Sequence, residues 1–139
     1  MPGYSGTPLA RKLGLKPGHR AVLLGAPDGF AATLAPLPDG AIVASAPADA
    51  APSVGVDVVV LFGREAAALR TTMPALAAGL PRGGALWVAW PKRAARQATD
   101  LTDGVVREIG LGTGLVDVKV CAVSDVWSGL KFVHRRGTA

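Results

Sequence analysis

The sequence contains one cysteine and few aromatic residues, and each shortage excludes a class of protein. Cys121 is the only cysteine among 139 residues, so neither an internal disulfide nor a cysteine metal cluster can form. No set of histidine, cysteine, aspartate and glutamate residues has the spacing of a metal site. Phenylalanine, tryptophan and tyrosine make up 5% of the chain, which leaves few rings to stack on nucleic-acid bases. We expect no metal cofactor and expect Cys121 to pack as a small apolar residue.

Long apolar runs are also missing, although half of the residues are apolar. The uninterrupted runs are as long as a β-strand, far below the roughly 20 residues that cross a bilayer. The first residues, MPGYSGTPLARKLG, lack a cationic segment followed by an apolar stretch and a small-residue cleavage site. We therefore expect a cytoplasmic protein that does not enter a membrane. A chain of this length is expected to form one domain, residues 1–139.

Positive charge is in excess, with a net charge of +5 and a pI near 10. The cations are scattered along the chain, with small groups near the N-terminus, after the tryptophan-rich run and at the C-terminus. A weak nucleic-acid binder that uses Lys92, Arg93 and Arg96 is one interpretation. A solubilising surface is the other, and the scatter favours it, so we expect no nucleic-acid partner.

Strand and helix patterns alternate over the first two thirds of the chain. Buried strands are predicted at residues 20–24 and 56–62 and in ALWVAW, with a weaker strand at 41–45 and a connector at 46–55. The segment REAAALRTTMPALAAGL predicts a helix that is kinked or divided by Pro74, and Thr99 or Asp100 is expected to cap the next helix. The inward positions predicted for the first of these helices are Ala67, Leu69, Met73, Leu76 and Leu80.

The last third of the chain predicts an antiparallel hairpin. In GLVDVKVCAV the apolar residues Val116, Val118, Val120 and Ala122 alternate with the others, and LKFVHRR behaves similarly. Right-handed crossovers then make the whole an α/β, three-layer Rossmann-like sandwich, whose mostly parallel sheet ends in this hairpin. The predicted strand order is 2-1-3-4-6-5.

The carboxyl ends of parallel strands are where ligands bind in such a sheet, near the point where the strand order reverses. Three turns and the start of one helix meet that description. The candidate ligand-binding residues are Gly25, Asp28, Gly29, Arg64, Trp90, Lys92, Arg93 and Asp100. Trp90 could stack on a planar group while Lys92 meets an anion, or it could simply complete the core while the cations reach into water.

Catalytic groups are not evident in the sequence. His19 lies just before the first strand and His134 in the last, so the two are not expected to act together as base and orienting group. The serines lack a nucleophile-elbow context. Asp100 and Asp103 could form a carboxylate pair, but helix capping is the favoured interpretation. We predict no catalytic residue.

Two segments resemble those of class I methyltransferases. LKPGHRAVLLGAPDG is similar to the helix, Pro-Gly turn, strand and glycine-rich turn that open such domains, and LPRGGALWV is similar to a later turn and strand. The resemblance implies an abridged methyltransferase-like fold, because the units between the second strand and VDVVVLF are replaced by a ten-residue connector. With YSGTPLARKLG and WVAWPK included, the chain also resembles a family of small uncharacterised bacterial proteins classed as a domain of unknown function.

Departures from the methyltransferase pattern lie at the residues that would hold S-adenosylmethionine. Leu23 stands where an acid is expected, Pro27 where the middle glycine belongs, and Ser45 or Ala46 where an acid would meet the ribose. Losing two charge-assisted hydrogen bonds implies binding weaker by roughly 100-fold or more. We therefore expect no cofactor, and S-adenosylmethionine is the alternative.

Three functions follow from these observations. The favoured one is a non-catalytic binding or protein-interaction module on a degenerate methyltransferase-like scaffold. The alternatives are an S-adenosylmethionine-dependent enzyme with a divergent cofactor pocket and the weak nucleic-acid binder. The partner would be an unidentified protein or a second copy of this chain, joined through the unguarded edge strand AIVAS or the adjacent connector.

Overall fold

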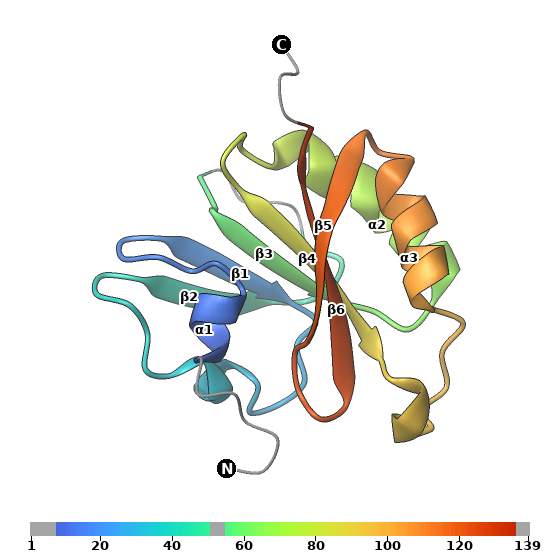
Figure 1. The fold of residues 1–139 in the computed structure, drawn as a ribbon, viewed down its shortest axis with the longest axis horizontal. Coiled ribbons are helices and arrows are strands. Elements are labelled where there is room, and N and C mark those ends of the chain that lie inside the picture. The colour runs from blue at the N-terminus through green and yellow to red at the C-terminus, as the bar shows by residue number, and fades with distance from the viewer. Residues whose placement is uncertain (1–7, 51–54, 136–139) are drawn as a thin grey trace.

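The computed structural model of the chain describes residues 8–50 and 55–135. Figure 1 shows a twisted sheet with short helical segments on one face and two longer helices on the other. In chain order the elements are α1 (Leu9–Lys12), β1 (Arg20–Leu24), the 3-10 turn η1 (Ala31–Leu34), β2 (Ile42–Ala46), β3 (Val58–Phe62), α2 (Ala66–Gly79), β4 (Ala85–Pro91), the 3-10 turn η2 (Arg93–Ala95), α3 (Asp103–Leu111), β5 (Leu115–Ala122) and β6 (Trp127–His134). Thr7, which would precede α1, and residues 51–54 of the connector lie outside the described residues.

The six strands form one sheet in the order β2-β1-β3-β4-β6-β5, which confirms the predicted fold class and order. β2, β1, β3 and β4 run parallel to one another, and β6 pairs antiparallel with both β4 and β5. Strand order reverses between β1 and β3, because β2 lies on the outer side of β1 and all later strands lie beyond β3. The region beside the carboxyl ends of β1 and β3 is therefore the switch point of this sheet.

The two faces of the sheet bury separate apolar cores. α2 and α3 cover the face that contains Leu86, Val88, Trp90 and Phe132, whereas α1 and η1 cover the face that contains Trp87. Trp87 is fully buried, and its indole Nε1 donates to the carbonyl of Leu13 at 3.0 Å, which ties the end of α1 to β4. Alternate residues of ALWVAW thus serve opposite cores, as expected for a central strand covered on both sides.

α2 follows the predicted helix with two differences. Leu69, Met73, Leu76 and Leu80 are buried as expected, but Ala67 is exposed, so that prediction was wrong. The helix begins at Ala66, and Ala67 falls on its solvent side because the inward stripe runs through Ala66, Leu69, Met73 and Leu76, at spacings of three and four residues. Pro74 does not divide the helix, which runs unbroken from Ala66 to Gly79. Pro74 is exposed, so the missing N–H lies on the side where water can reach the freed carbonyl.

β5 departs from simple alternation because a β-bulge interrupts its pairing with β6. The register shifts between Asp117 and Lys119, so Val118 is the extra residue. The strand is partly exposed, as predicted, but two of the alternating apolar residues face solvent, since Val118 and Val120 are 53% and 52% exposed. Before the bulge, Asp117 pairs with Arg107 of α3 at 2.9 Å between Oδ2 and Nε. The hydrogen bond from Arg107 holds the pKa of Asp117 below its ordinary value.

None of the helices in the described part of the chain has the length and apolar character that crossing a membrane requires.

Candidate functional site

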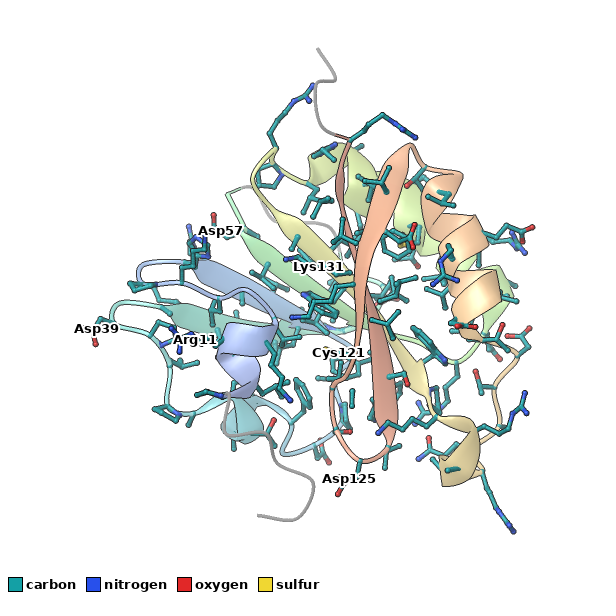
Figure 2. All side chains as sticks on the ribbon, viewed as in Figure 1. Arg11, Asp39, Asp57, Cys121, Asp125 and Lys131 are labelled. Atoms are coloured by element: carbon teal, nitrogen blue, oxygen red, sulfur yellow. The ribbon has the colours of Figure 1, made fainter. Side chains whose placement is uncertain are left out.

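The parallel strands define two edges of the sheet, and the ionisable residues differ between them. Asp125, labelled in Figure 2, lies in the β5–β6 turn at the edge where β4 ends, whereas Asp57, just before β3, marks the opposite edge. Both histidines lie at the opposite edge. His19 Nδ1 accepts from the amide of Lys16, and His134 Nε2 bonds with the carbonyl of Leu80 at 2.6 Å. Each has a structural partner, and neither histidine lies at the carboxyl edge.

The turn after β1 places two glycines at the switch point. Gly25 has φ +71°, and its amide donates to the carbonyl of Ala46 at 2.9 Å. A Cβ at Gly25 would lie 2.9 Å from Cβ of Ala48, so the chain beyond β2 packs directly on this turn. Gly29 has φ +82° and nothing within 4 Å of a Cβ position. Only glycine adopts this conformation without strain, and at Gly29 the space beside the backbone is open.

Part of the turn has unused hydrogen-bond donors. Among the described residues, the amides of Ala26, Asp28 and Gly29 have no backbone or side-chain acceptor. Pro27 between them supplies no N–H. Asp28 is exposed, as are Gly25 and Gly29. The turn therefore presents amide donors to solvent at the point where the strand order reverses.

A row of aromatic rings leads from this turn to Arg64. Phe30, which follows the turn, meets Phe62 edge to face with centroids 4.9 Å apart, and Phe62 meets Trp127 in the same way at 5.1 Å. The guanidinium carbon of Arg64 lies 4.8 Å from the centroid of Trp127, a cation–π contact. Arg64 directly follows the glycine at the end of β3, so the row joins the ends of β1, β3 and β6.

Residues 97–100 fix Arg64 in place. Gln97 Oε1 accepts from Arg64 Nε at 3.2 Å and from Nη2 at 2.9 Å. The carbonyl of Arg64 accepts from Thr99 Oγ1 at 2.7 Å and from the amide of Asp100 at 3.2 Å. The side chain and the backbone of Arg64 are thus both held by one short segment that comes more than 30 residues later.

Asp100 has a role that its position in the sequence did not suggest. Its Oδ1 accepts from the amide of Ala66 at 2.7 Å, so it caps the start of α2. Thr102 caps α3 instead, accepting from the amide of Val105 at 3.2 Å. The prediction that Thr99 or Asp100 caps α3 was therefore wrong, because both side chains are turned back toward the β3–α2 turn.

A groove of about 500 Å³ lies between the end of β4, the start of α3 and the hairpin. Lys92, Arg93, Gln97 and Thr99 form part of its polar lining. Thr102 and Asp103 lie at the α3 end of the lining. Trp90, Pro91, Leu101 and Val120 supply apolar walls. Trp90 is only 6% exposed and packs in the α2–α3 core, so its ring is mostly core and leaves little surface for stacking on a ligand.

The candidate residues thus occupy two neighbouring places. Trp90, Lys92 and Arg93 line the groove, and Arg64 and Asp100 touch the segment that borders it. Gly25, Asp28 and Gly29 lie in the turn after β1, at the other end of the aromatic row. Gln97 and Trp127 were not predicted. Neither has a local sequence signal, because their contacts with Arg64 depend on how the segment after β4 folds back.

Metal binding finds no support within residues 8–50 and 55–135, where no group of three or more histidine, cysteine or acidic residues could hold an ion. Cys121 is partly buried, and burial raises the pKa of its thiol, which disfavours the nucleophilic thiolate.

The fold is similar to several solved structures at low sequence identity. PigF with SAH is 8% identical, covers 84% of this chain and 56% of its own, and gives a TM-score of 0.62. The O-methyltransferase NcsB1 from neocarzinostatin biosynthesis, with S-adenosyl-L-homocysteine and 1,4-dihydroxy-2-naphthoic acid, is 12% identical, with 85% and 49% covered and a TM-score of 0.63. A possible exported protein from Bordetella parapertussis is 13% identical, with 91% and 66% covered and a TM-score of 0.64.

These likenesses show a methyltransferase-like fold, and the chain spans about half the length of PigF and NcsB1. No protein-family model matches the sequence, and no curated protein matches it.

The expectation of no cofactor is corrected by these comparisons. PigF was solved with SAH, and NcsB1 with S-adenosyl-L-homocysteine or with S-adenosylmethionine. The expectation rested on three departures from the methyltransferase pattern: Leu23 in place of an acid, Pro27 in place of the middle glycine, and Ser45 or Ala46 in place of the acid that would meet the ribose. Side chains at these positions do not decide the matter, because the backbone amides of a turn can also bind a ligand.

Proposed function

We propose that this domain binds S-adenosylmethionine at the carboxyl edge of its sheet and acts as an enzyme of the methyltransferase type. The turn from Gly25 to Gly29 supports the proposal more than any other feature. It lies at the switch point, where ligands bind in open α/β sheets, and it offers amide donors beside open space. S-adenosylmethionine would supply the activated methyl group.

The residues present fit this ligand through the backbone and less completely through side chains. The amides of Ala26, Asp28 and Gly29, which have no acceptor among the described residues, can donate to the carboxylate of an amino-acid group. Asp49 lies in the turn after β2, one residue beyond Ala48, which packs on Gly25. We assign Asp49 to the ribose hydroxyls, in place of the acid missing at Ser45 and Ala46. Because this chain offers fewer charged contacts than the methyltransferase pattern, we expect it to bind S-adenosylmethionine weakly.

Ligand binding is tested by thermal shift and calorimetry with S-adenosylmethionine and S-adenosylhomocysteine. A ligand at 100 times its dissociation constant stabilises the folded state by about 2.7 kcal/mol, which is easily measured. Gly29→Trp should abolish the shift because it fills the open space. Gly18→Trp is the matched control. Gly18 also has positive φ, at +75°, and open space around it, but it lies before β1 at the opposite edge.

No shift with either compound at millimolar concentration would overturn the proposal. An equal loss of binding in Gly29→Trp and Gly18→Trp would overturn the assignment of the ligand to this turn. Asp49→Asn should weaken binding by about ten-fold, the worth of one charge-assisted hydrogen bond.

A binding module without catalysis is the second candidate, favoured by the position of both histidines at the opposite edge. The two functions differ in turnover. An enzyme that has bound labelled S-adenosylmethionine forms S-adenosylhomocysteine when the acceptor is present, whereas a binding module returns the ligand unchanged. The membership of the chain in the family of small bacterial proteins stays a prediction, as does the weak nucleic-acid binding by Lys92, Arg93 and Arg96.

A further inference from the structure

Arg64 is a cation held in one position without an acid to neutralise it. The residue is exposed, stacked on Trp127 and hydrogen-bonded to Gln97. Two ion pairs are present in the described residues, Arg70–Glu108 and Arg107–Asp117, and neither involves Arg64, Lys92 or Arg93. A guanidinium carries five N–H donors, and Gln97 accepts from two nitrogens of Arg64. The donors that remain find no acceptor among residues 8–50 and 55–135.

Arg64 does not itself line the groove after β4, but it is bonded to two residues that do. Gln97 and Thr99, which both line the groove, contact the side chain and the carbonyl of Arg64 respectively. The volume of about 500 Å³ lies within the range of small-molecule sites. Leu101, Pro91 and Val120 give it an apolar wall against which a flat ring could pack.

Positive and negative side chains of the groove lie on different elements. Lys92 and Arg93 lie in the lining on the β4 side, whereas Asp103 lies at the start of α3. Asp100 is also close, but its carboxylate already accepts the amide of Ala66. An anion entering the groove is therefore drawn away from Asp103 and toward Lys92 and Arg93, and Arg64, bonded to Gln97 of the lining, adds a further positive charge.

We propose that this groove binds a small molecule with an apolar body and a carboxylate, and that Arg64 binds the carboxylate. The planar fork of arginine matches a carboxylate with two parallel hydrogen bonds, and fixing it beforehand lowers the conformational entropy lost on binding. The inference rests on the proposed function in one respect, because the molecule would be the acceptor that lies beside the cofactor. Anion binding itself requires no cofactor.

The probes for this proposal are benzoate and benzamide, which share a ring and differ in charge. Protein NMR follows the Nε–H signal of Arg64 and the indole signal of Trp127 during titration with each. We expect benzoate to shift both signals in a saturable way and to bind at least about ten-fold more tightly than benzamide, the ratio that one charge-assisted interaction gives. Equal binding of the two probes, or a shift that does not saturate, would overturn the proposal.

Substitutions at Arg64 and at a control arginine test which residue binds the carboxylate of benzoate. Arg64→Gln should weaken benzoate binding by about ten-fold or more, and Arg64→Lys should give an intermediate loss because the charge stays while the fork is lost. Arg82→Gln, an exposed arginine in the turn before β4 at the opposite edge, should change nothing. The indole signal of Trp87, bonded to Leu13 within the core, reports whether each variant is folded.

Two results would overturn the assignment to Arg64. One is loss of benzoate binding in Lys92→Gln while Arg64→Gln binds normally, which would move the carboxylate to Lys92. The other is an equal loss in Arg82→Gln, which would mean general attraction to a cationic protein. Each titration is run with and without S-adenosylhomocysteine. Benzoate binding without any response to that compound would contradict the proposed function and leave the anion site standing.

Discussion

Gly110 lies inside α3 at a point where a side chain has no room. A Cβ there would overlap the ring of Phe132, which is fully buried on β6. Alanine is the better helix former by up to about 1 kcal/mol, but crowding a packed core costs about 1–3 kcal/mol or more. We therefore predict that Gly110→Ala lowers the free energy of unfolding by about 1–2 kcal/mol, measured by urea denaturation.

Gly104 provides the control at the same scale, because it lies in the same helix and is exposed. The nearest atom to its Cβ position is Oγ1 of Thr102 at 3.9 Å, an ordinary contact. Gly104→Ala should leave stability unchanged or raise it slightly. If Gly110→Ala were also neutral, the close approach of α3 to β6 would be less rigid than the packing indicates.

At the scale of elements, α3 depends on one capping side chain. Thr102 accepts from the amide of Val105 at the start of the helix, and it also lines the groove. Removing a cap of this kind costs about 0.5–2 kcal/mol. We predict a loss of about 1 kcal/mol in Thr102→Ala and almost none in Thr102→Ser, both measured by urea denaturation. Equal losses in the two variants would mean that the methyl group of Thr102, and not its hydroxyl, stabilises the helix start.

Most of the elements could be predicted because their signals are local. β1 and β3 contain the continuous apolar runs AVLL and VVVLF, and the buried positions of α2 recur at helical spacing. The cap of α3 could not be chosen, since Thr99, Asp100 and Thr102 are all good capping residues in one short segment. Asp100 is drawn to the amide of Ala66, which lies 34 residues earlier. The bulge at Val118 is likewise set by pairing with β6 and not by β5 itself.

Some features of the candidate site could also be predicted from the sequence, and others could not. The rule for open sheets predicted which strand ends to examine, and Lys92 and Arg93 do line a groove there. It could not decide whether Trp90 stacks on a ligand or completes the core, because a tryptophan of either kind can end a fully buried strand. Gln97 was missed because an amide in a polar segment has no pattern until its partner, Arg64, is located.

At the scale of the whole molecule, the outer edge of β2 has no strand beside it in the sheet. The amide of Ile42 donates to His19 and the carbonyl of Ala46 accepts from Gly25, so these residues face β1. In a parallel ladder the alternate residues, Val43 and Ser45, then direct their backbone groups outward. Ile42 is 59% exposed, and no charged side chain lies on the strand. The homodimer through this edge stays a prediction.

Ser45→Pro tests that dimer, because proline removes an outward donor without breaking the pairing with β1. We predict a dimer for the native chain at high concentration and a monomer for Ser45→Pro, measured by size-exclusion light scattering. Ala44→Pro is the comparison, since it disturbs the bonds to β1 and should lower stability as well. A native chain that stays monomeric, or a dimer that survives in Ser45→Pro, would rule out this edge.

The bond between Asp100 and the first turn of α2 has a consequence for hydrogen exchange. The amide of Ala66 stays protected only while residues 97–100 remain folded against Arg64. Local opening of that segment therefore releases Arg64 and exposes the Ala66 amide to deuterium in one event. A molecule that binds on Arg64 stabilises the closed form and slows exchange at Ala66. Slower deuterium exchange at the start of α2 would then report that the groove is occupied, although α2 does not line the groove.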